Sequence, residues 1–435
     1  MKSFWKFIEG EWAKNLANRL SIPKERSVQN ALDYERLFIA CKQNEALHAR
    51  AASLRINLNG ISKQSIADAW RLINHQSLVM EARATSFPQQ KKYVDHHIHS
   101  SLHHMALAMH QSLQKEGDLL EAAGRLLQVS NTADPDHKST QPGRHISLQQ
   151  LSQLIRHSLG FSLRVAPSKI DHPDAGRGVF LEGTALPGTL IALVPGLTYS
   201  RTQYKRMPNF PRIDIGNPYL SRTYEMDVID SKPWGDGDQT CSPRMNMQQE
   251  EDSSNDLGGL NGRSWVQPTC PEARLLEVLE GRHPLAVGHM INHPEPGMQP
   301  NVLEVGFDWT LRPGEEPWLR VYIPNLPLVK QEEEEEDNQV EEISVRTDGD
   351  IMNREEQLRA WCQELLPGKP ACKARGIALI ATKFIKDGEE ILQNYRLNPW
   401  GPRPLWYHPV NVEEDERRWA QLPLINVMAP PRSKL

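Results

Sequence analysis

Apolar residues recur at helical spacing through the first third of the chain. Phe4, Ile8, Trp12 and Leu16 follow one another at every fourth position. Up to about Gln128 prolines are few, and Leu, Ala, Gln and Lys are abundant. A repeat of three to four residues places apolar side chains on one face of a helix. The pattern therefore predicts an all-helical N-terminal domain over residues 1–130.

The pattern changes after a polar stretch. The segment NTADPDHKSTQPGR is typical of a loop, and we predict a linker over residues 131–145. A short helix, ISLQQLSQLIRHSLGF, follows it. Beyond Phe161 come short apolar and β-branched runs separated by Gly and Pro, such as GRGVFLEG, GTLIALVPGLTY, EMDVID and ARGIALIATKF, which predict short strands. The expected fold class is α+β, with a mainly β domain over residues 146–410 and a tail over 411–435.

Two long polar inserts interrupt the β-rich half, at about 235–280 and 328–352. Residues 331–350 hold ten acidic side chains and one basic side chain, a net of −9. Because the whole chain carries −5, the remaining residues sum to +4. An acidic run is usually a solvated loop, although it can also attract a basic partner.

Composition narrows the class of protein. A length of 435 residues suits two or three domains, and no apolar run approaches the ~18 residues of a membrane-spanning helix. The net charge gives no reason to expect direct nucleic-acid contact. The cysteines form no C-x-x-C pair, which favours reduced thiols and argues against a zinc cluster; they are Cys41, Cys241, Cys270, Cys362 and Cys372. We expect a soluble intracellular protein, nuclear or cytoplasmic, that does not bind membranes; the lysines of the first helix leave organelle targeting open.

The densest histidine cluster lies in DHHIHSSLHHMALAMH. On a helix, four of its histidines fall within about 60° of one another, a stripe that could bind metal. An adjacent apolar stripe indicates instead that the histidines border a buried face. We favour this second interpretation and expect no metal site. The histidines are His96, His99, His103 and His110, and the apolar residues are Ile98, Leu102, Met105 and Met109.

Three segments of the β-rich half carry candidate chemistry. In AGRGVFLEG, Gly176 and Gly178 flank Arg177 and leave bare backbone that a ligand could approach closely. In HPLAVGHMINHPEPGMQPNV, the pair Asn292 and His293 follows an apolar run and offers several donors and acceptors. The third segment, KDGEEILQNY, places Tyr395 after a turn and a strand.

Taken in order, GRGVF, INHPEPGMQPN and DGEEILQNY, followed by PLWY at 404–407, resemble the SET-domain family of protein-lysine N-methyltransferases. The resemblance covers about residues 161–410, without the zinc clusters that flank the domain in some relatives. It implies small curved sheets with a C-terminal pseudoknot, S-adenosyl-L-methionine as cofactor, and methyl transfer to a lysine of a protein substrate.

The resemblance also assigns roles to residues. The backbone of Gly176, Arg177 and Gly178 would hold the amino-acid end of the cofactor. Asn292 and His293 would hydrogen-bond the cofactor, and the Tyr395 hydroxyl would act catalytically beside the sulfonium. Trp406, or failing that Trp400, would cover the adenine.

Two departures from the family pattern weaken the expectation of activity. Pro294 replaces the usual Ser after Asn-His, and Val194 stands where an aromatic residue commonly shapes the lysine channel. Tyr199 or Tyr224 could substitute for that aromatic. The alternative function is a catalytically inactive SET-fold protein that binds peptides or acts as a scaffold. In either case the helical N-terminal domain could bind a protein partner.

Overall fold

The computed structural model describes seven stretches of the chain. They are residues 24–53, 74–116, 148–200, 219–231 (without 226), 283–310, 322–327 and 373–420 (without 402). The first amphipathic repeat, the linker, both predicted inserts and all cysteines except Cys41 lie outside these stretches.

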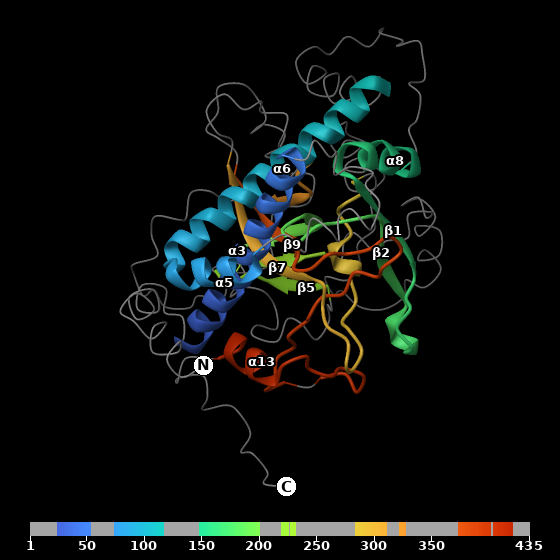
Figure 1. Ribbon diagram of the computed structural model, residues 1–435. Helices are drawn as coiled ribbons and strands as arrows, with labels where there is room; N and C mark the ends of the chain where they lie inside the picture. The colour runs from blue at the N-terminus through green and yellow to red at the C-terminus, as the bar shows by residue number, and fades with distance from the viewer. Residues whose placement is uncertain are drawn as a thin grey trace, which may run out of the picture.

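Helices come first in the described chain. They are α3 (Lys24–Ser53), α5 (His75–Ala84), α6 (Phe87–Glu116) and α8 (Leu148–Leu159). Asn74 caps α5 by accepting a hydrogen bond from the Ser77 amide. Helices α3, α5 and α6 lie together on one side of the strands, and α8 lies near β1 (Figure 1). Helices followed by strands confirm the predicted α+β class.

The strands form three small sheets. The hairpin of β1 (Phe161–Pro167) and β2 (Arg177–Gly183) is antiparallel and encloses a short 3-10 helix, η1 (Pro173–Ala175). A second antiparallel sheet has the order β3 (Leu190–Val194), β9 (Lys373–Ala381), β7 (Val302–Thr310). The third has the order β5 (Leu220–Arg222), β6 (Val228–Asp230), β4 (Gly196–Tyr199), β8 (Asn325–Pro327), and its β4–β8 pair is parallel. The resemblance implied small sheets, and the sheets of the structure are small and mainly antiparallel.

One hydrophobic core joins the helices to the sheets. Strand β9 is central, and its side chains from Ile377 to Ala381 are buried, as expected of a strand covered on both faces. The predicted apolar stripe of α6 packs into the same core, because Ile98, Leu102, Met105 and Met109 are all buried. Burial of this stripe confirms the amphipathic reading of α6.

The histidines of α6 contact the β-rich part, as expected of residues bordering a buried face. His97 Nε2 lies 2.8 Å from the Gly188 carbonyl oxygen, and His99 Nε2 lies 3.0 Å from that of Thr310. His110 Nδ1 lies 3.1 Å from the Tyr322 hydroxyl, whereas His96 is exposed. Within the described residues, no three His, Cys, Asp or Glu side chains are grouped to hold a metal ion. In the same stretches, no helix combines the length and apolar character needed to cross a bilayer.

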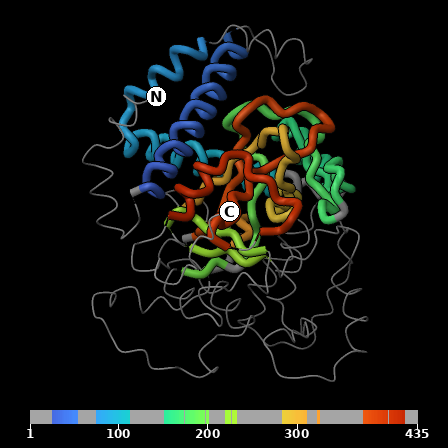
Figure 2. The backbone as a smooth tube through the Cα atoms, turned by 90° about the horizontal axis from the view of Figure 1, so that it is seen from below, coloured from blue at the N-terminus to red at the C-terminus, as the bar shows by residue number. Residues whose placement is uncertain are grey.

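The last helix of the described chain packs against the first one. Residues after 410, which we assigned to a tail, form α13 (Val412–Arg418), capped by Asn411. Helix α13 packs against α3, and the view from below shows the C-terminal segment beside that helix (Figure 2). Segments almost four hundred residues apart in sequence thus lie side by side.

Candidate functional site

The segment 390–395 passes between the two ends of the loop 291–302. Leu392 pairs in parallel with Asn292, and Gln393 pairs in parallel with Val302. The Gln393 amide donates to the Asn292 carbonyl at 2.9 Å, and the Asn301 amide donates to the Leu392 carbonyl at 3.0 Å. This passage brings the three candidate segments of the sequence together.

Asn301 fastens the crossing segment. Its Nδ2 donates to the Glu390 carbonyl at 2.8 Å, and its Oδ1 accepts from the Leu392 amide at 2.8 Å. The amide side chain thereby pairs with the backbone of residues 390–392 as a neighbouring strand would, with one donor and one acceptor. Asn301 is buried, so both bonds form away from water.

Glycine is required at the two positions of the turn 175–178 for different structural reasons. Gly176 has φ +54°, a conformation that glycine adopts readily, and a Cβ built there would meet no atom within 4 Å. At Gly178 a Cβ would lie 2.1 Å from Glu390 Oε1. Gly176 therefore leaves open backbone in the site, and Gly178 allows the buried Glu390 carboxylate to approach β2.

The side chain of Asn292 hydrogen-bonds to the backbone of this turn. Its Nδ2 donates to the carbonyl oxygens of Ala175 at 3.1 Å and Arg177 at 3.0 Å, and it lies 3.4 Å from Glu390 Oε1. Glu390 in turn accepts from Ser168 Oγ at 2.7 Å and the Lys169 amide at 2.8 Å. Glu390 belongs to the DGEEILQNY motif, but its sequence neighbours do not indicate that its side chain contacts the glycine turn. The side-chain donor of Asn292 is used within the protein, which leaves its Oδ1 as the atom that could accept from a ligand.

The ring of His293 holds the main chain on both sides. Its Nε2 lies 2.7 Å from the His408 carbonyl oxygen, and its Nδ1 lies 3.2 Å from the Tyr395 amide nitrogen. A carbonyl only accepts and an amide only donates, so the proton is assigned to Nε2. Burial lowers the pKa of His293, which favours this neutral form.

Tyr395 lies at the centre of the site. Its hydroxyl donates to the Ile291 carbonyl at 3.0 Å, and its ring centroid is 5.5 Å from that of His293. Burial, and to a smaller extent nearby Tyr219, raises the pKa of the Tyr395 hydroxyl well above its ordinary value. Tyr395 is therefore protonated at neutral pH, and it is not suited to act as a base.

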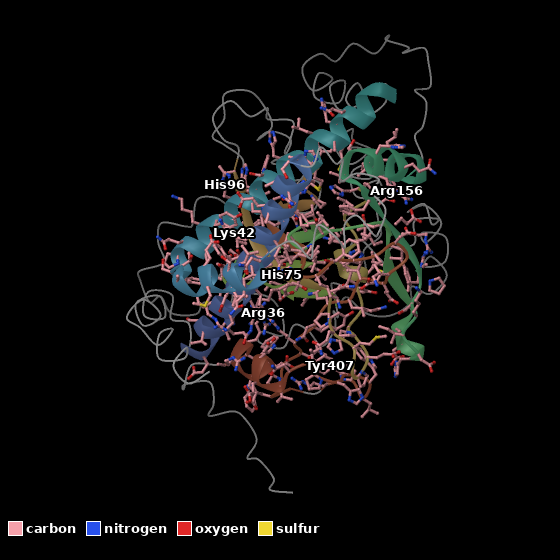
Figure 3. All side chains as sticks on the ribbon, in the orientation of Figure 1. Arg36, Lys42, His75, His96, Arg156 and Tyr407 are labelled. Atoms are coloured by element: carbon pink, nitrogen blue, oxygen red, sulfur yellow. The ribbon has the colours of Figure 1, made fainter. Side chains whose placement is uncertain are left out.

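Aromatic rings extend from Tyr395 to the C-terminal segment. The ring of Trp406 meets that of Tyr395 edge-on at 6.3 Å and lies 6.1 Å from the ring of His172, which precedes the glycine turn in the sequence. Tyr407 lies 4.6 Å from His293, and Figure 3 shows it close to α13. Its hydroxyl donates to Asp415 Oδ2 at 2.9 Å. Trp400, the second candidate for the adenine cover, is 47% exposed.

The two departures from the family pattern also have defined positions. Val194 is buried in β3, where its carbonyl accepts from Asn325 Nδ2 at 2.8 Å, and Pro294 is buried beside His293. Of the two candidate substitutes, Tyr199 is buried in β4, and Tyr224 donates its hydroxyl to Asp33 Oδ2 on α3 at 2.6 Å.

A further tyrosine, Tyr219, raises the pKa of Tyr395. It also meets His289 edge-on at 6.3 Å. No motif in the sequence marks Tyr219, because it lies in a polar stretch between the strands β4 and β5.

The described residues thus form an α+β protein in which the three candidate segments and the following segment 404–407 come together. The structure brings the seven candidate residues close to one another: Gly176, Arg177, Gly178, Asn292, His293, Tyr395 and Trp406. In comparisons with known proteins, no family model, no curated protein and no solved structure matches the chain.

Proposed function

We propose that the protein is an S-adenosyl-L-methionine-dependent protein-lysine N-methyltransferase with Tyr395 as its catalytic residue. One observation carries the proposal: the glycine turn, the Asn292–His293 pair and Tyr395 converge on the segment 390–395. Passage of that segment between residues 292 and 302 supports a SET-like arrangement with a C-terminal pseudoknot. A protein that only needed a stable fold would have no requirement for this combination of an open glycine backbone, an amide and a partly buried tyrosine.

The residues present are chemically suited to the cofactor. The open backbone at Gly176 and Arg177 would receive its amino-acid end, Asn292 Oδ1 would accept a hydrogen bond, and the Trp406 ring would cover the adenine. Both ring nitrogens of His293 are used within the protein. His293 would therefore contact the cofactor through its backbone and not through its ring. The cofactor would supply a methyl group on a positively charged sulfur.

Tyr395 is suited to orienting the reacting groups rather than to exchanging protons. Its hydroxyl proton is directed to the Ile291 carbonyl, so the oxygen lone pairs are available on the other side. They can attract a methyl group that carries partial positive charge and the N–H of an incoming lysine.

The lysine must lose its charge before it reacts. Free lysine has a pKa of ~10.4, and burial beside a positive sulfur disfavours the ammonium form. The displaced proton leaves to water, because neither His293 nor Tyr395 is in a state to accept it. Alignment of the neutral amine with the methyl group and the sulfur would then provide most of the rate enhancement.

Calorimetry with S-adenosyl-L-methionine tests the cofactor site. We expect wild type to bind, and we expect Asn292→Ala to bind about tenfold more weakly, as for loss of one hydrogen bond to a ligand. Tyr395→Phe should retain binding but lower methyl transfer about 100-fold, as typically follows loss of one preorganised polar group at a reacting centre. Tyr93→Phe is the matched control, because that hydroxyl pairs with Glu45 in the helical part. Absence of cofactor binding by wild type would overturn the proposal.

Transfer of a radiolabelled methyl group to proteins of a cell lysate identifies the substrate class, and we expect the label on lysine. The competing function is an inactive SET-fold protein that binds peptides or acts as a scaffold, and Val194 and Pro294 favour it. The residue of β3 at the position where the family commonly has an aromatic is Val194, which is buried, and Pro294 replaces the usual Ser. Binding of the cofactor without any transfer, together with peptide capture, would support this alternative.

A further inference from the structure

The residue after Tyr395 has an unusual backbone conformation. Arg396 has φ +47°, and it is the only non-glycine residue with positive φ in the described stretches. This left-handed region is sterically unfavourable for residues with a Cβ, and such strain persists where surrounding contacts enforce it. Because one peptide bond joins the two residues, whatever fixes Arg396 also limits where Tyr395 can lie.

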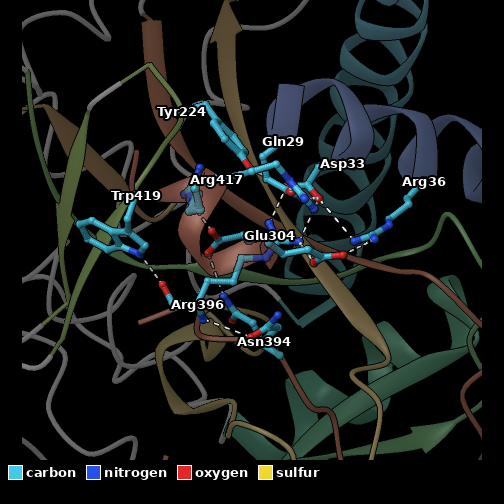
Figure 4. A network of polar contacts seen from close by, with 12 residues as sticks. Gln29, Asp33, Arg36, Tyr224, Glu304, Asn394, Arg396, Arg417 and Trp419 are labelled. Atoms are coloured by element: carbon cyan, nitrogen blue, oxygen red, sulfur yellow. Dashed lines mark hydrogen bonds and ion pairs between the residues drawn. The ribbon is translucent and has the colours of Figure 1, made fainter. Parts of the chain in front are cut away.

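Two helices from opposite ends of the described chain hold the Arg396 side chain (Figure 4). Its Nη1 lies 2.5 Å from Asp33 Oδ2, and its Nη2 lies 2.9 Å from Asp33 Oδ1, a bidentate pair with α3. Its Nη2 also lies 3.1 Å from Glu414 Oε2 on α13. Arg396 and Asp33 side chains are each 3% exposed, so the pair is shielded from solvent screening.

Further contacts fix Asp33 itself. Its Oδ2 accepts from the Tyr224 hydroxyl at 2.6 Å, and its Oδ1 accepts from Gln29 Nε2 at 3.1 Å. Burial alone would raise the pKa of Asp33, but Arg396 and Tyr224 outweigh that effect and hold it below its ordinary value. Asp33 therefore carries a negative charge at neutral pH.

The main chain of Arg396 is held as firmly as its side chain. Its amide lies 3.2 Å from Asn394 Oδ1, and its carbonyl accepts from Trp419 Nε1. Tyr395 is consequently fixed on its N-terminal side by His293 and on its C-terminal side by Arg396. Buried ion pairs are often no more stabilising than well-packed apolar residues, so stability alone is a weak reason for this network.

We propose that Asp33 is a positioning residue that fixes Tyr395 through Arg396, so that α3, which carries none of the motif residues, belongs to the functional site. The inference deepens the proposed methyltransferase function and rests on it. It assigns a role to the helical part that is independent of partner binding.

The test is Asp33→Asn, which keeps the shape of the side chain and removes its charge. With 3-fluorotyrosine incorporated at position 395, we expect its fluorine NMR signal to shift or broaden. Methyl transfer should show a kcat lower by about 100-fold, the size of effect that a misplacement of about 1 Å produces. Affinity for S-adenosyl-L-methionine should be nearly unchanged, because the glycine turn and Asn292 do not contact Asp33.

The matched control is Asp95→Asn. Asp95 also lies on a helix, accepts from a tyrosine hydroxyl (Tyr34, 3.3 Å) and pairs with a cation (Lys91, 2.9 Å). We expect this variant to leave both the fluorine signal and kcat as in wild type. If Asp33→Asn does not fold, Glu414→Gln replaces it, because Glu414 is the second carboxylate on Arg396.

Three outcomes overturn the inference. The first is a folded Asp33→Asn variant with the wild-type fluorine signal and kcat. The second is an equal change in the Asp33 and Asp95 variants, which would indicate a general structural effect. The third is a loss of kcat in Asp33→Asn without any change in the fluorine signal. If wild type transfers no methyl group, the proposed function fails, and the fluorine signal still decides whether Asp33 positions Tyr395.

Discussion

At the scale of single residues, the site depends on positions where a side chain has no room. We predict that Gly178→Ala destabilises the protein by about 1–3 kcal/mol, the usual cost of overpacking. The new methyl group would lie 2.1 Å from Glu390 Oε1, and Glu390 is held by Ser168 and Lys169. Urea denaturation measures the free energy of unfolding.

Gly401→Ala is the matched control for Gly178→Ala. A Cβ at Gly401 would meet its nearest atom, Asn398 Nδ2, at 3.6 Å, an ordinary contact distance. We expect its unfolding free energy to stay within about 0.5 kcal/mol of wild type. Equal stability of the two alanine variants would contradict the close packing between β2 and Glu390.

A buried histidine makes stability depend on pH. His283 Nε2 lies 2.8 Å from the Tyr322 carbonyl oxygen, and its Nδ1 accepts from the Leu285 amide. Burial lowers the pKa of His283 from 6.5 to about 4. The unfolded chain therefore binds a proton more readily than the folded chain, so this contribution is complete above pH 6.5 and is lost as the pH falls toward 4.

We predict that this histidine alone reduces the free energy of unfolding by up to about 3 kcal/mol between neutral pH and pH 4. Denaturation curves at several pH values measure the slope for wild type and His283→Gln. The variant should be less stable at pH 7 and should lose less stability on acidification. His104→Gln, at an exposed position on α6, should keep the wild-type slope. An unaltered slope in His283→Gln would refute the assignment.

The sequence predicted those site residues that lie in short continuous motifs, and it missed those that act across long separations. Gly176, Asn292 and Tyr395 could be found because local patterns mark them. Asp33 could not, because its partner Arg396 is 363 residues away and a lone Asp in a helix has no distinguishing neighbours. The tautomer of His293 depends on the His408 carbonyl, which only the folded chain supplies.

At the scale of secondary-structure elements, periodicity predicted the kind of element but not its neighbours. The runs GRGVFLEG, GTLIALVPGLTY, EMDVID and ARGIALIATKF correspond to β2, β3 with β4, β6, and β9. Strand β9 pairs with β3, which lies far before it in the sequence, and with β7, so the sheet order rests on contacts that periodicity does not encode.

Helix α6 illustrates what an amphipathic pattern can and cannot predict. Its apolar stripe correctly indicates a buried face, with Leu102 1% exposed. The bordering histidines were predicted to lie at the edge of that buried face, but the pattern could not show that several of them contact backbone and hydroxyl groups of the β-rich part. Imidazole suits such a boundary because it offers both an apolar ring and a hydrogen-bonding nitrogen.

At the scale of the whole molecule, the helical and β-rich parts depend on each other. They share one hydrophobic core, and the buried Arg396 of the β-rich part forms an ion pair with Asp33 of the helical part. Removing one partner of a buried ion pair leaves an uncompensated charge, which typically costs about 3–5 kcal/mol. A total stability of about 5–15 kcal/mol is usual for a folded domain.

We therefore predict that residues 146–435, produced without the helical part, do not fold cooperatively. Loss of α3 and α6 would expose core residues such as Trp309, which is fully buried in the whole chain, and would leave Arg396 without Asp33. Urea denaturation and size-exclusion chromatography should reveal an aggregating or non-cooperative fragment.

Co-expression with residues 1–145 should restore a soluble complex. Asp33→Asn in the helical fragment should weaken that complex, whereas Asp95→Asn should not. A cooperative unfolding transition of the isolated β-rich fragment would instead show that its fold is independent of the helices.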